Sequence, residues 1–315
     1  MDTRSIGSLR VSAVGLGCNN FGWHLDEPAS RAVVHAALDA GVTHFDTADV
    51  YGDGESERML GRALGARRAD VVVATKFGNR TDGRPETVAR SAEASLTRLG
   101  TDVIDLYYYH KPDGQTPVAD TLGALARLVE AGSVREVACS NFSAAQMHEA
   151  EAVGVGVRFV ANQGEYSLLH RDPETNGELD ACRALGLAYV PYFPLKSGLL
   201  TGKYRRGYPA PGGTRLAGDT VGSAFQSMGS RLLTDANLDA VERLAGWAEA
   251  HGRTLLDLAF AFLLRSGFTR ARPVVASVIA GATTPSQIVA NAAAAATPLT
   301  DAEVDEVDAL LGASV

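Results

Sequence analysis

Four polar residues that could transfer a proton follow apolar runs in the first third of the chain. They are Asp46 at the end of THFD, Tyr51 five residues later, Lys76 at the end of VVVATK and His110 at the end of IDLYYYH. A free tyrosine, with a pKa of about 10, is a poor acid at neutral pH, and a nearby cation lowers that pKa by about 1–3 units. We therefore expect Lys76 to make Tyr51 a proton donor. Asp46 would hold Lys76 charged, and His110 would hydrogen-bond a substrate oxygen as charge develops on it.

Each of these residues also has an ordinary structural role open to it. An aspartate after a strand often caps a helix, a lysine beside Phe77 can lay its stem along the apolar ring, and a lone histidine is commonly a hydrogen-bonded core residue. The interpretation as a proton-transfer site therefore depends on a fold that brings the four side chains together.

The chain alternates short β-branched or aromatic runs with stretches of helical periodicity. Eight runs are predicted as strands: Ser12–Gly17, Thr43–Ala48, Val71–Phe77, Ile104–His110, Arg135–Ser140, Phe159–Gln163, Leu187–Phe193 and Val274–Ala280. Helices are predicted over Pro28–Ala40, Glu86–Leu99 and Val118–Ala131, each followed by a glycine. This alternation implies parallel strands joined by right-handed crossovers.

Eight such units in about 250–300 residues are typical of a closed (β/α)8 TIM barrel, whose chemistry lies at the carboxyl ends of the strands. A doubly wound α/β sheet is the rival, but the glycines of GLGCNNFG depart from the GxGxxG fingerprint of that fold. We therefore predict an α/β fold, a (β/α)8 barrel that forms a single domain over residues 1–315. A small hairpin within Arg4–Val11 would close the barrel floor, and a long loop, Lys203–Gly229, would follow the seventh strand.

Composition and charge argue against several classes of protein. Lys and Arg number 29 against 37 Asp and Glu, and the net charge of −8 argues against a nucleic-acid partner. The 3 cysteines form neither a CxxC pair nor a zinc-type cluster, so we expect no metal and a reducing compartment. The N-terminus lacks an apolar signal stretch, and no run approaches the about 20 apolar residues of a membrane span. We expect a cytoplasmic protein without membrane association.

The four polar residues and their surroundings resemble the aldo-keto reductase superfamily. The catalytic tetrad of that family is aspartate, tyrosine, lysine and histidine in this order, and Asp46, Tyr51, Lys76 and His110 match it residue by residue, within the family-like strings FDTADVYG and ATKFG. The resemblance runs from GLGCNNFG to Asn291. It implies an NAD(P)H-dependent oxidoreductase that reduces an aldehyde or ketone to the alcohol, with Tyr51 as the proton donor.

The same resemblance implies how the cofactor is held. In CSNFSAAQ, Ser140 and Asn141 would bind the nicotinamide carboxamide together with Gln163, and Tyr192 would stack on the ring. The backbone from Leu195 to Gly202 would wrap the pyrophosphate. The full set that the resemblance implies for the cofactor is Gly17, Cys18, Asp46, Ser140, Asn141, Gln163, Tyr192, Leu195, Gly198, Leu200, Gly202, Lys203, Gly281, Thr283, Gln287 and Asn291.

The adenosine end of this set departs from the best-known family members. Those members place a lysine and an arginine where Gly281 and Gln287 stand, and Gln287 offers only neutral hydrogen bonds. Thr284 is predicted to cap a helix that begins at Pro285 and whose amino end favours anions. We expect NADPH to be preferred, with NAD(H) also used, and positive charge to come from Lys203, Arg205 or Arg206 in the long loop.

The substrate is predicted less directly than the cofactor. The residues expected to contact it are Trp23, Tyr51, Phe77 and His110, with a wall formed by His24, Gly78, Lys111, Asp113 and the Lys203–Gly229 loop. Their mixture of aromatic and polar groups suits a hydroxylated carbonyl compound such as a sugar.

Two other classes of function stay open. Some proteins that resemble aldo-keto reductases act as nicotinamide-sensing partners of other proteins with little turnover. A metal-dependent barrel hydrolase is suggested by His44 and Asp46 on one strand face, but the chain lacks the HxH pair and the further histidines that such a site needs.

Overall fold

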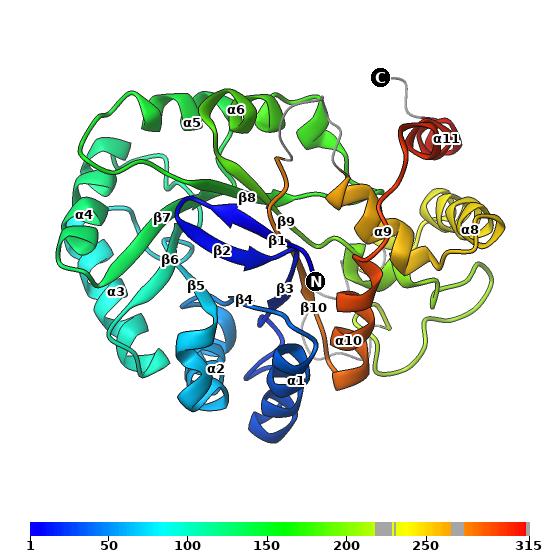
Figure 1. Ribbon diagram of the computed structural model, residues 1–315, viewed down its shortest axis with the longest axis horizontal. Coiled ribbons are helices and arrows are strands. Elements are labelled where there is room, and N and C mark those ends of the chain that lie inside the picture. Colours follow the sequence, from blue (N-terminus) through cyan, green and yellow to red (C-terminus); the bar gives the residue numbers. More distant parts are fainter. Residues whose placement is uncertain (218–228, 230, 266–273, 313–315) are drawn as a thin grey trace.

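The computed structural model describes residues 1–217, 229, 231–265 and 274–312. Eight parallel strands close into a barrel in the order β10-β3-β4-β5-β6-β7-β8-β9 (Figure 1). Their bounds are β3 Val14–Gly17, β4 His44–Asp46, β5 Val72–Phe77, β6 Ile104–Tyr109, β7 Val134–Ser140, β8 Ala161–Glu165, β9 Ala188–Tyr192 and β10 Val278–Gly281. This confirms the predicted (β/α)8 barrel.

Side-chain alternation along the strands decides which residues face the barrel interior. Every residue of β5 is buried, as expected for a strand that is covered on both faces. Val72 and Ala74 belong to the cluster that fills the barrel, whereas Val73 and Phe77 belong to the cluster between the strands and the helices. The same alternation places Lys76 inside, at the carboxyl end of β5.

A hairpin precedes the barrel, as predicted. Strands β1 (Thr3–Ile6) and β2 (Leu9–Ser12) pair antiparallel. Ile6, Leu9 and Val11 pack in the cluster that fills the barrel, and Ser8 donates a 2.6 Å hydrogen bond to Glu136 near the start of β7. The hairpin therefore closes the end of the barrel opposite the carboxyl ends of the strands.

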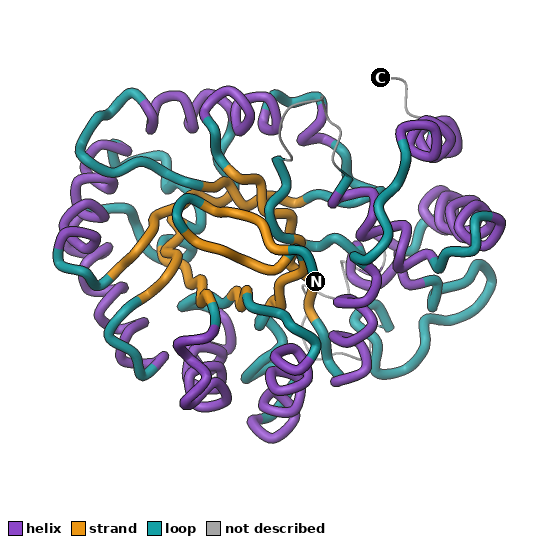
Figure 2. The backbone as a smooth tube through the Cα atoms, viewed as in Figure 1, coloured by secondary structure: helices purple, strands orange, loops and turns teal. Residues whose placement is uncertain are grey.

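Helices surround the strands on their outer side (Figure 2). Their bounds are α1 Glu27–Asp39, α2 Glu55–Leu64, α3 Pro85–Leu99, α4 Val118–Glu130, α5 Ala144–Glu151, α6 Glu178–Leu185, α8 Asp235–Ala250, α9 Leu255–Leu264, α10 Pro285–Ala294 and α11 Asp301–Leu311. Short 3-10 turns are η1 Tyr51–Gly54, η2 Gly65–Asp70, η3 Asp172–Glu174 and η4 Lys196–Thr201. The three helices predicted from periodicity are present, each displaced by at most one residue at either end. Gly100 ends α3 in the left-handed conformation that favours glycine.

The strands are shorter than their apolar runs predicted. β10 begins at Val278 rather than Val274, because Val275 makes only an isolated bridge to Tyr189. β6 ends at Tyr109, so His110 lies just beyond the strand. The long connection between β9 and β10 contains η4, α8 and α9, and residues 218–228 of the predicted Lys203–Gly229 loop lie outside the described residues.

Candidate active site

A buried ion pair lies at the carboxyl ends of β4 and β5. Lys76 Nζ donates a 2.6 Å hydrogen bond to Asp46 Oδ1 and another of 2.7 Å to the Thr47 carbonyl, and the lysine side chain has no exposed surface. Burial lowers the pKa of Lys76, but the negative charges of Asp46 and of an ionised Tyr51 outweigh it and the pKa is raised overall. The ammonium is therefore charged at neutral pH.

Tyr51 and His110 complete the group of four that the sequence singled out. Lys76 Nζ lies 5.3 Å from the centre of the Tyr51 ring. The Tyr51 and His110 rings are arranged edge to face, with their centres 6.1 Å apart. Tyr51 opens η1, where Gly52 and Asp53 adopt left-handed backbone conformations and turn the chain sharply. The carboxylate, ammonium, phenol and imidazole thus converge at the mouth of the barrel.

The electrostatics of Tyr51 differ from the sequence prediction. Burial raises the pKa of Tyr51, and the Lys76 ammonium offsets only part of that rise. The pKa of Tyr51 is therefore not lowered below that of free tyrosine, contrary to the expectation, because burial outweighs the effect of Lys76. Burial, with a smaller effect of Lys76, lowers the pKa of His110 to about 3. His110 is neutral at physiological pH and can donate or accept a hydrogen bond without carrying charge.

A hydrogen-bonded set of amides and hydroxyls lies beside the ion pair. Gln163 Nε2 donates a 2.8 Å hydrogen bond to Asp46 Oδ2, and the Ser140 hydroxyl donates to the Gln163 carbonyl at 3.0 Å. Asn141, with a left-handed φ of 60°, donates to Ser140 Oγ and accepts a 2.9 Å hydrogen bond from the Tyr192 hydroxyl. These groups offer both donors and acceptors, as a primary amide ligand requires.

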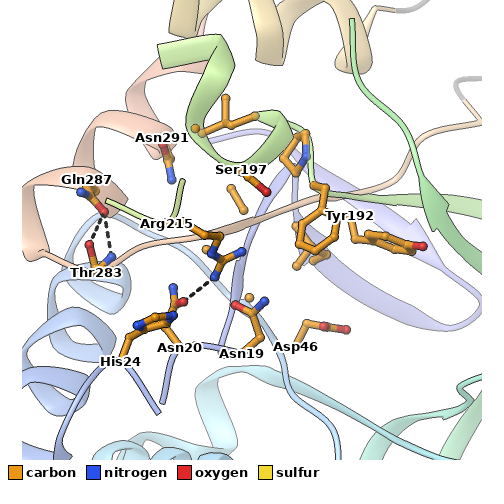
Figure 3. A pocket seen from close by; sticks show the side chains of 18 of the residues that line it. Asn19, Asn20, His24, Asp46, Tyr192, Ser197, Arg215, Thr283, Gln287 and Asn291 are labelled. Carbon is orange, nitrogen blue, oxygen red and sulfur yellow. Dashed lines mark hydrogen bonds between the residues drawn. The ribbon is translucent and has the colours of Figure 1, made fainter. Parts of the chain in front are cut away.

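The two segments expected at the other end of the cofactor also meet. One cavity of about 710 Å³ is lined by residues of both segments: Leu195, Ser197, Gly198, Thr201 and Lys203 from the η4 region, and Gly281, Thr283, Gln287 and Asn291. Figure 3 labels Ser197, Thr283, Gln287 and Asn291 around this cavity. The same cavity reaches Asp46, Tyr51 and His110 at its other end. The Thr284 Oγ1 hydroxyl accepts a 3.3 Å hydrogen bond from the backbone N–H of Gln287, which confirms the predicted cap of α10.

The side chains of three residues assigned to the site do not line the cavity. Phe77 is fully buried between Tyr107 and Tyr109, with ring centres 4.9 and 5.1 Å away, because alternation along β5 turns it toward the helices. Its assignment to the substrate is therefore wrong. The Cys18 thiol and the Leu200 side chain are likewise buried in the core, so neither side chain reaches the cavity.

Trp23 and Gly202 lie close to the cavity without being part of its lining. The Trp23 ring is 44% exposed and lies 4.0 Å, centre to centre, from His24, which does line the cavity. Gly202 ends η4 in a left-handed conformation next to Lys203. Both therefore border the site through a neighbour.

No helix within the described ranges is both long and apolar enough to cross a membrane. Among the same residues, no three His, Cys, Asp or Glu side chains gather as a metal site would require.

Comparison with known proteins identifies the family. A family model described as Aldo/keto reductase family matches residues 13–311. The chain belongs to the aldo/keto reductase family. An L-glyceraldehyde 3-phosphate reductase of Escherichia coli O157:H7 is 31% identical over 90% of this chain and 84% of that protein. A probable voltage-gated potassium channel subunit beta of Oryza sativa subsp. japonica is 35% identical over 99% of this chain and 97% of its own.

Solved structures agree with this assignment. The glycerol dehydrogenase of Gluconobacter oxydans has a TM-score of 0.82 and 29% sequence identity, over 99% of this chain and 95% of that one. The barrel of this aldo/keto reductase is therefore shared along nearly its whole length with a solved oxidoreductase.

Arg215 is a cavity residue that sequence reasoning missed in this aldo/keto reductase. Its guanidinium donates a 2.6 Å hydrogen bond to Asn20 Oδ1 and lies centrally in the cavity, between Gln287 on one side and Tyr192 on the other (Figure 3). Arg206, which the sequence offered as a source of charge, instead pairs with Asp235 and Asp239 of α8. The long loop contains several basic residues, and no local pattern marks which of them faces inward.

Proposed function

We propose that this aldo/keto reductase reduces an aldehyde or ketone to the alcohol with a nicotinamide cofactor, and that Tyr51 donates the proton. The observation that carries the proposal is the fully buried Lys76 ammonium, held by Asp46 at 2.6 Å and 5.3 Å from the Tyr51 ring, at one end of a long cavity. A buried cation beside a phenol stabilises the phenolate that remains after proton donation.

Each member of the group of four has a distinct part in this proposal. Tyr51 is protonated at neutral pH, because burial raises its pKa, and it is therefore ready to act as an acid. Lys76 stabilises the negative charge left on the phenol, and Asp46 keeps Lys76 charged. His110, which is neutral, donates a hydrogen bond to the substrate oxygen and orients the carbonyl.

The residues along the cavity fit a dinucleotide. A nicotinamide cofactor, when bound, supplies the hydride for the carbonyl carbon. Ser140, Asn141 and Gln163 would hold its carboxamide, and the Tyr192 ring would lie against the nicotinamide. The hydrogen bond from Nε2 to Asp46 orients the Gln163 amide, and its Oε1 would accept a hydrogen bond from the carboxamide.

The middle and far parts of the cavity suit phosphate groups and an adenosine. Lys203 and Arg215 bring two positive charges to the cavity, and the pKa of Lys203 is lowered by burial and then by Arg215. This proximity of two cations favours an anionic ligand between or beside them. We propose a modest preference for NADPH over NADH, because Gln287 supplies no charge at the adenosine end.

The substrate that we propose is a hydroxylated carbonyl compound such as a sugar. Tyr51, His110 and His24 line the cavity and carry groups able to hydrogen-bond carbonyl and hydroxyl oxygens. Two similar proteins are named after small hydroxylated compounds: an L-glyceraldehyde 3-phosphate reductase and a glycerol dehydrogenase. These names are consistent with the same chemical class.

We also propose a single barrel domain over residues 1–315 and a cytoplasmic location. The family match over residues 13–311 supports the single domain. Cys18, Cys139 and Cys182 are buried free thiols, which suits a reducing compartment.

The test is a substrate screen with both cofactors. Purified protein is incubated with NADPH or NADH and a panel of aldehydes, ketones and aldoses, and cofactor oxidation is followed by absorbance. We expect turnover on several hydroxylated aldehydes, faster with NADPH. Nucleotide binding without turnover on any carbonyl compound would contradict the proposal.

A second candidate function is that of a nicotinamide-binding partner of another protein. The observation that favours it is the similarity to the Oryza sativa protein named as a probable potassium channel subunit beta. The same screen separates the two functions, because a partner of this kind would bind nucleotide tightly and oxidise NADPH negligibly with every carbonyl.

A further inference from the structure

The segment that leads from β9 into η4 has a strained backbone. Phe193, Lys196 and Ser197 have φ values of 51°, 44° and 57°, in the left-handed region that non-glycine residues rarely adopt. Gly198 follows at 92°. Strained non-glycine residues persist where surrounding contacts hold them, and they gather at binding sites. The contacts that fix this segment are therefore of functional interest.

One of those contacts is an ion pair between Lys196 and Glu165. Lys196 Nζ donates to Glu165 Oε1, and the two side chains are only 14% and 28% exposed. Glu165 is the last residue of β8 and pairs in register with Tyr192 of β9. The carboxylate is thus carried by the barrel itself, whereas the ammonium is carried by the strained turn.

The ion pair is not part of the cavity lining, although its neighbours in the chain are. Leu195, Ser197 and Gly198 line the cavity, and Figure 3 shows the Ser197 side chain there, but neither Lys196 nor Glu165 is part of the lining. Lys196 therefore reaches back to the barrel from a turn whose other residues face the cavity. Its ammonium is paired with the Glu165 carboxylate.

We propose that the Glu165–Lys196 ion pair is a positioning pair that fixes the turn at residues 195–198 for binding the anionic part of the nucleotide. This inference rests on the proposed nicotinamide-dependent function. A partly buried ion pair holds geometry better than an exposed one, because solvent and salt screen it less. Pre-formed turns bind more tightly, since less ordering is required on binding.

The test compares two nearly isosteric variants, Glu165→Gln and Lys196→Met, by calorimetric titration with NADPH and NADP+. We expect each variant to weaken nucleotide binding about five-fold, which corresponds to about 1 kcal/mol and lies within the range of coupling energies between contacting residues. The double variant should bind no more weakly than either single variant, because all three have lost the same interaction. The KM for NADPH should rise in the same proportion as the dissociation constant, because the two variants act on the turn that binds the nucleotide.

A second readout does not need a ligand. The Gly198 amide donates a 2.8 Å hydrogen bond to the Leu195 carbonyl inside the turn. Hydrogen exchange at residues 195–198 should be faster in both variants than in the wild type, with exchange in β5 and β6 unchanged. The control variant is Glu151→Gln, which breaks the exposed Arg158–Glu151 pair remote from the cavity and should leave both readouts unchanged.

The outcomes distinguish this inference from the proposed function. If the wild type binds neither nucleotide, the proposed function is overturned and the positioning role with it. If the wild type binds but the variants match it, only the positioning role is overturned. Tighter binding in Glu165→Gln would also overturn it, since a released Lys196 would then be acting as a charge on the ligand.

Discussion

Gln163 Nε2 donates a 2.8 Å hydrogen bond to Asp46 Oδ2, while the other oxygen of the same carboxylate accepts the Lys76 ammonium at 2.6 Å. One carboxylate thus joins the amide groups proposed to hold the nicotinamide to the cation beside Tyr51. The hydrogen bond also fixes the orientation of the Gln163 side chain. A change at Asp46 is therefore expected to act on cofactor position as well as on proton transfer.

Replacing Tyr51 by phenylalanine should abolish nearly all carbonyl reduction. The phenol is the only acidic proton that we assign to the substrate oxygen, and general acid catalysis contributes about 10²–10⁴ in rate. Nucleotide affinity should stay within a few-fold, because Lys203, Arg215 and the α10 end of the cavity are unchanged. The measurements are single-turnover NADPH oxidation and calorimetric titration, and retention of more than a tenth of the chemical rate would show that Tyr51 is not the acid.

Replacing Asp46 by asparagine should lower activity and shift its basic pH limb to lower pH. Asp46 raises the pKa of Lys76 and also that of Tyr51, so the loss of its charge lowers both pKa values. Reduction requires the protonated phenol and is lost as pH rises through these values, so the loss should begin earlier in the variant. The measurement is the pH profile of kcat/KM between pH 6 and 10. An unchanged profile and rate would leave Asp46 with a structural role only.

Much of this site was predictable because sequence pattern and strand alternation agree. Asp46, Lys76 and His110 follow runs whose alternation turns them inward at the same end of the barrel, and their clustering follows from topology alone. Phe77 was wrongly assigned because successive side chains of a strand point to opposite faces of the sheet. Phe77 follows Lys76 directly and therefore faces the helices and not the barrel interior.

Two features depended on three-dimensional packing that no local pattern encodes. The pKa of Tyr51 is set by how deeply the loop buries the phenol, and burial outweighs the cation that the sequence suggested. Arg215 comes from a long loop in which Arg206 turns outward to α8 and Arg215 turns inward to Asn20. Charge alone does not distinguish these two arginines in the sequence.

Replacing His44 by phenylalanine should make stability less sensitive to acid. His44 is fully buried inside the barrel near Asp46 and Lys76. Neither of its ring nitrogens has a hydrogen-bond partner among the described residues, and burial lowers the pKa of the imidazole to about 4. Between the unfolded pKa of 6.5 and that value, the unfolded chain binds a proton that the folded protein does not. The wild type therefore loses about 2–3 kcal/mol of unfolding free energy through His44 as pH falls from 7.5 to 4.5.

The measurement is urea unfolding of both proteins at pH 7.5 and 4.5. At pH 7.5 the unfolding free energy of the variant should equal or exceed that of the wild type. Replacing a buried polar ring that has no hydrogen-bond partner by an apolar ring of similar size costs little stability. Other groups titrate equally in the two proteins, so the difference between them isolates His44. Equal losses in both proteins between the two pH values would show that His44 is protonated or solvated in the folded state.

Replacing Gln287 by arginine should increase the preference for NADP over NAD by about ten-fold or more. Charge-assisted hydrogen bonds contribute about 1.5–3 kcal/mol, and an arginine matches the planar geometry of a phosphate. The structure adds a cost, because Gln287 Oε1 accepts hydrogen bonds from Thr283 N at 2.7 Å and from Thr283 Oγ1 at 3.1 Å, and the variant loses both. The matched control is Gln287→Met, which loses the same bonds without adding charge. Titration of both nucleotides against all three proteins should show the larger NADP/NAD ratio in the arginine variant alone. A ratio unchanged in that variant would place the 2′-phosphate away from residue 287.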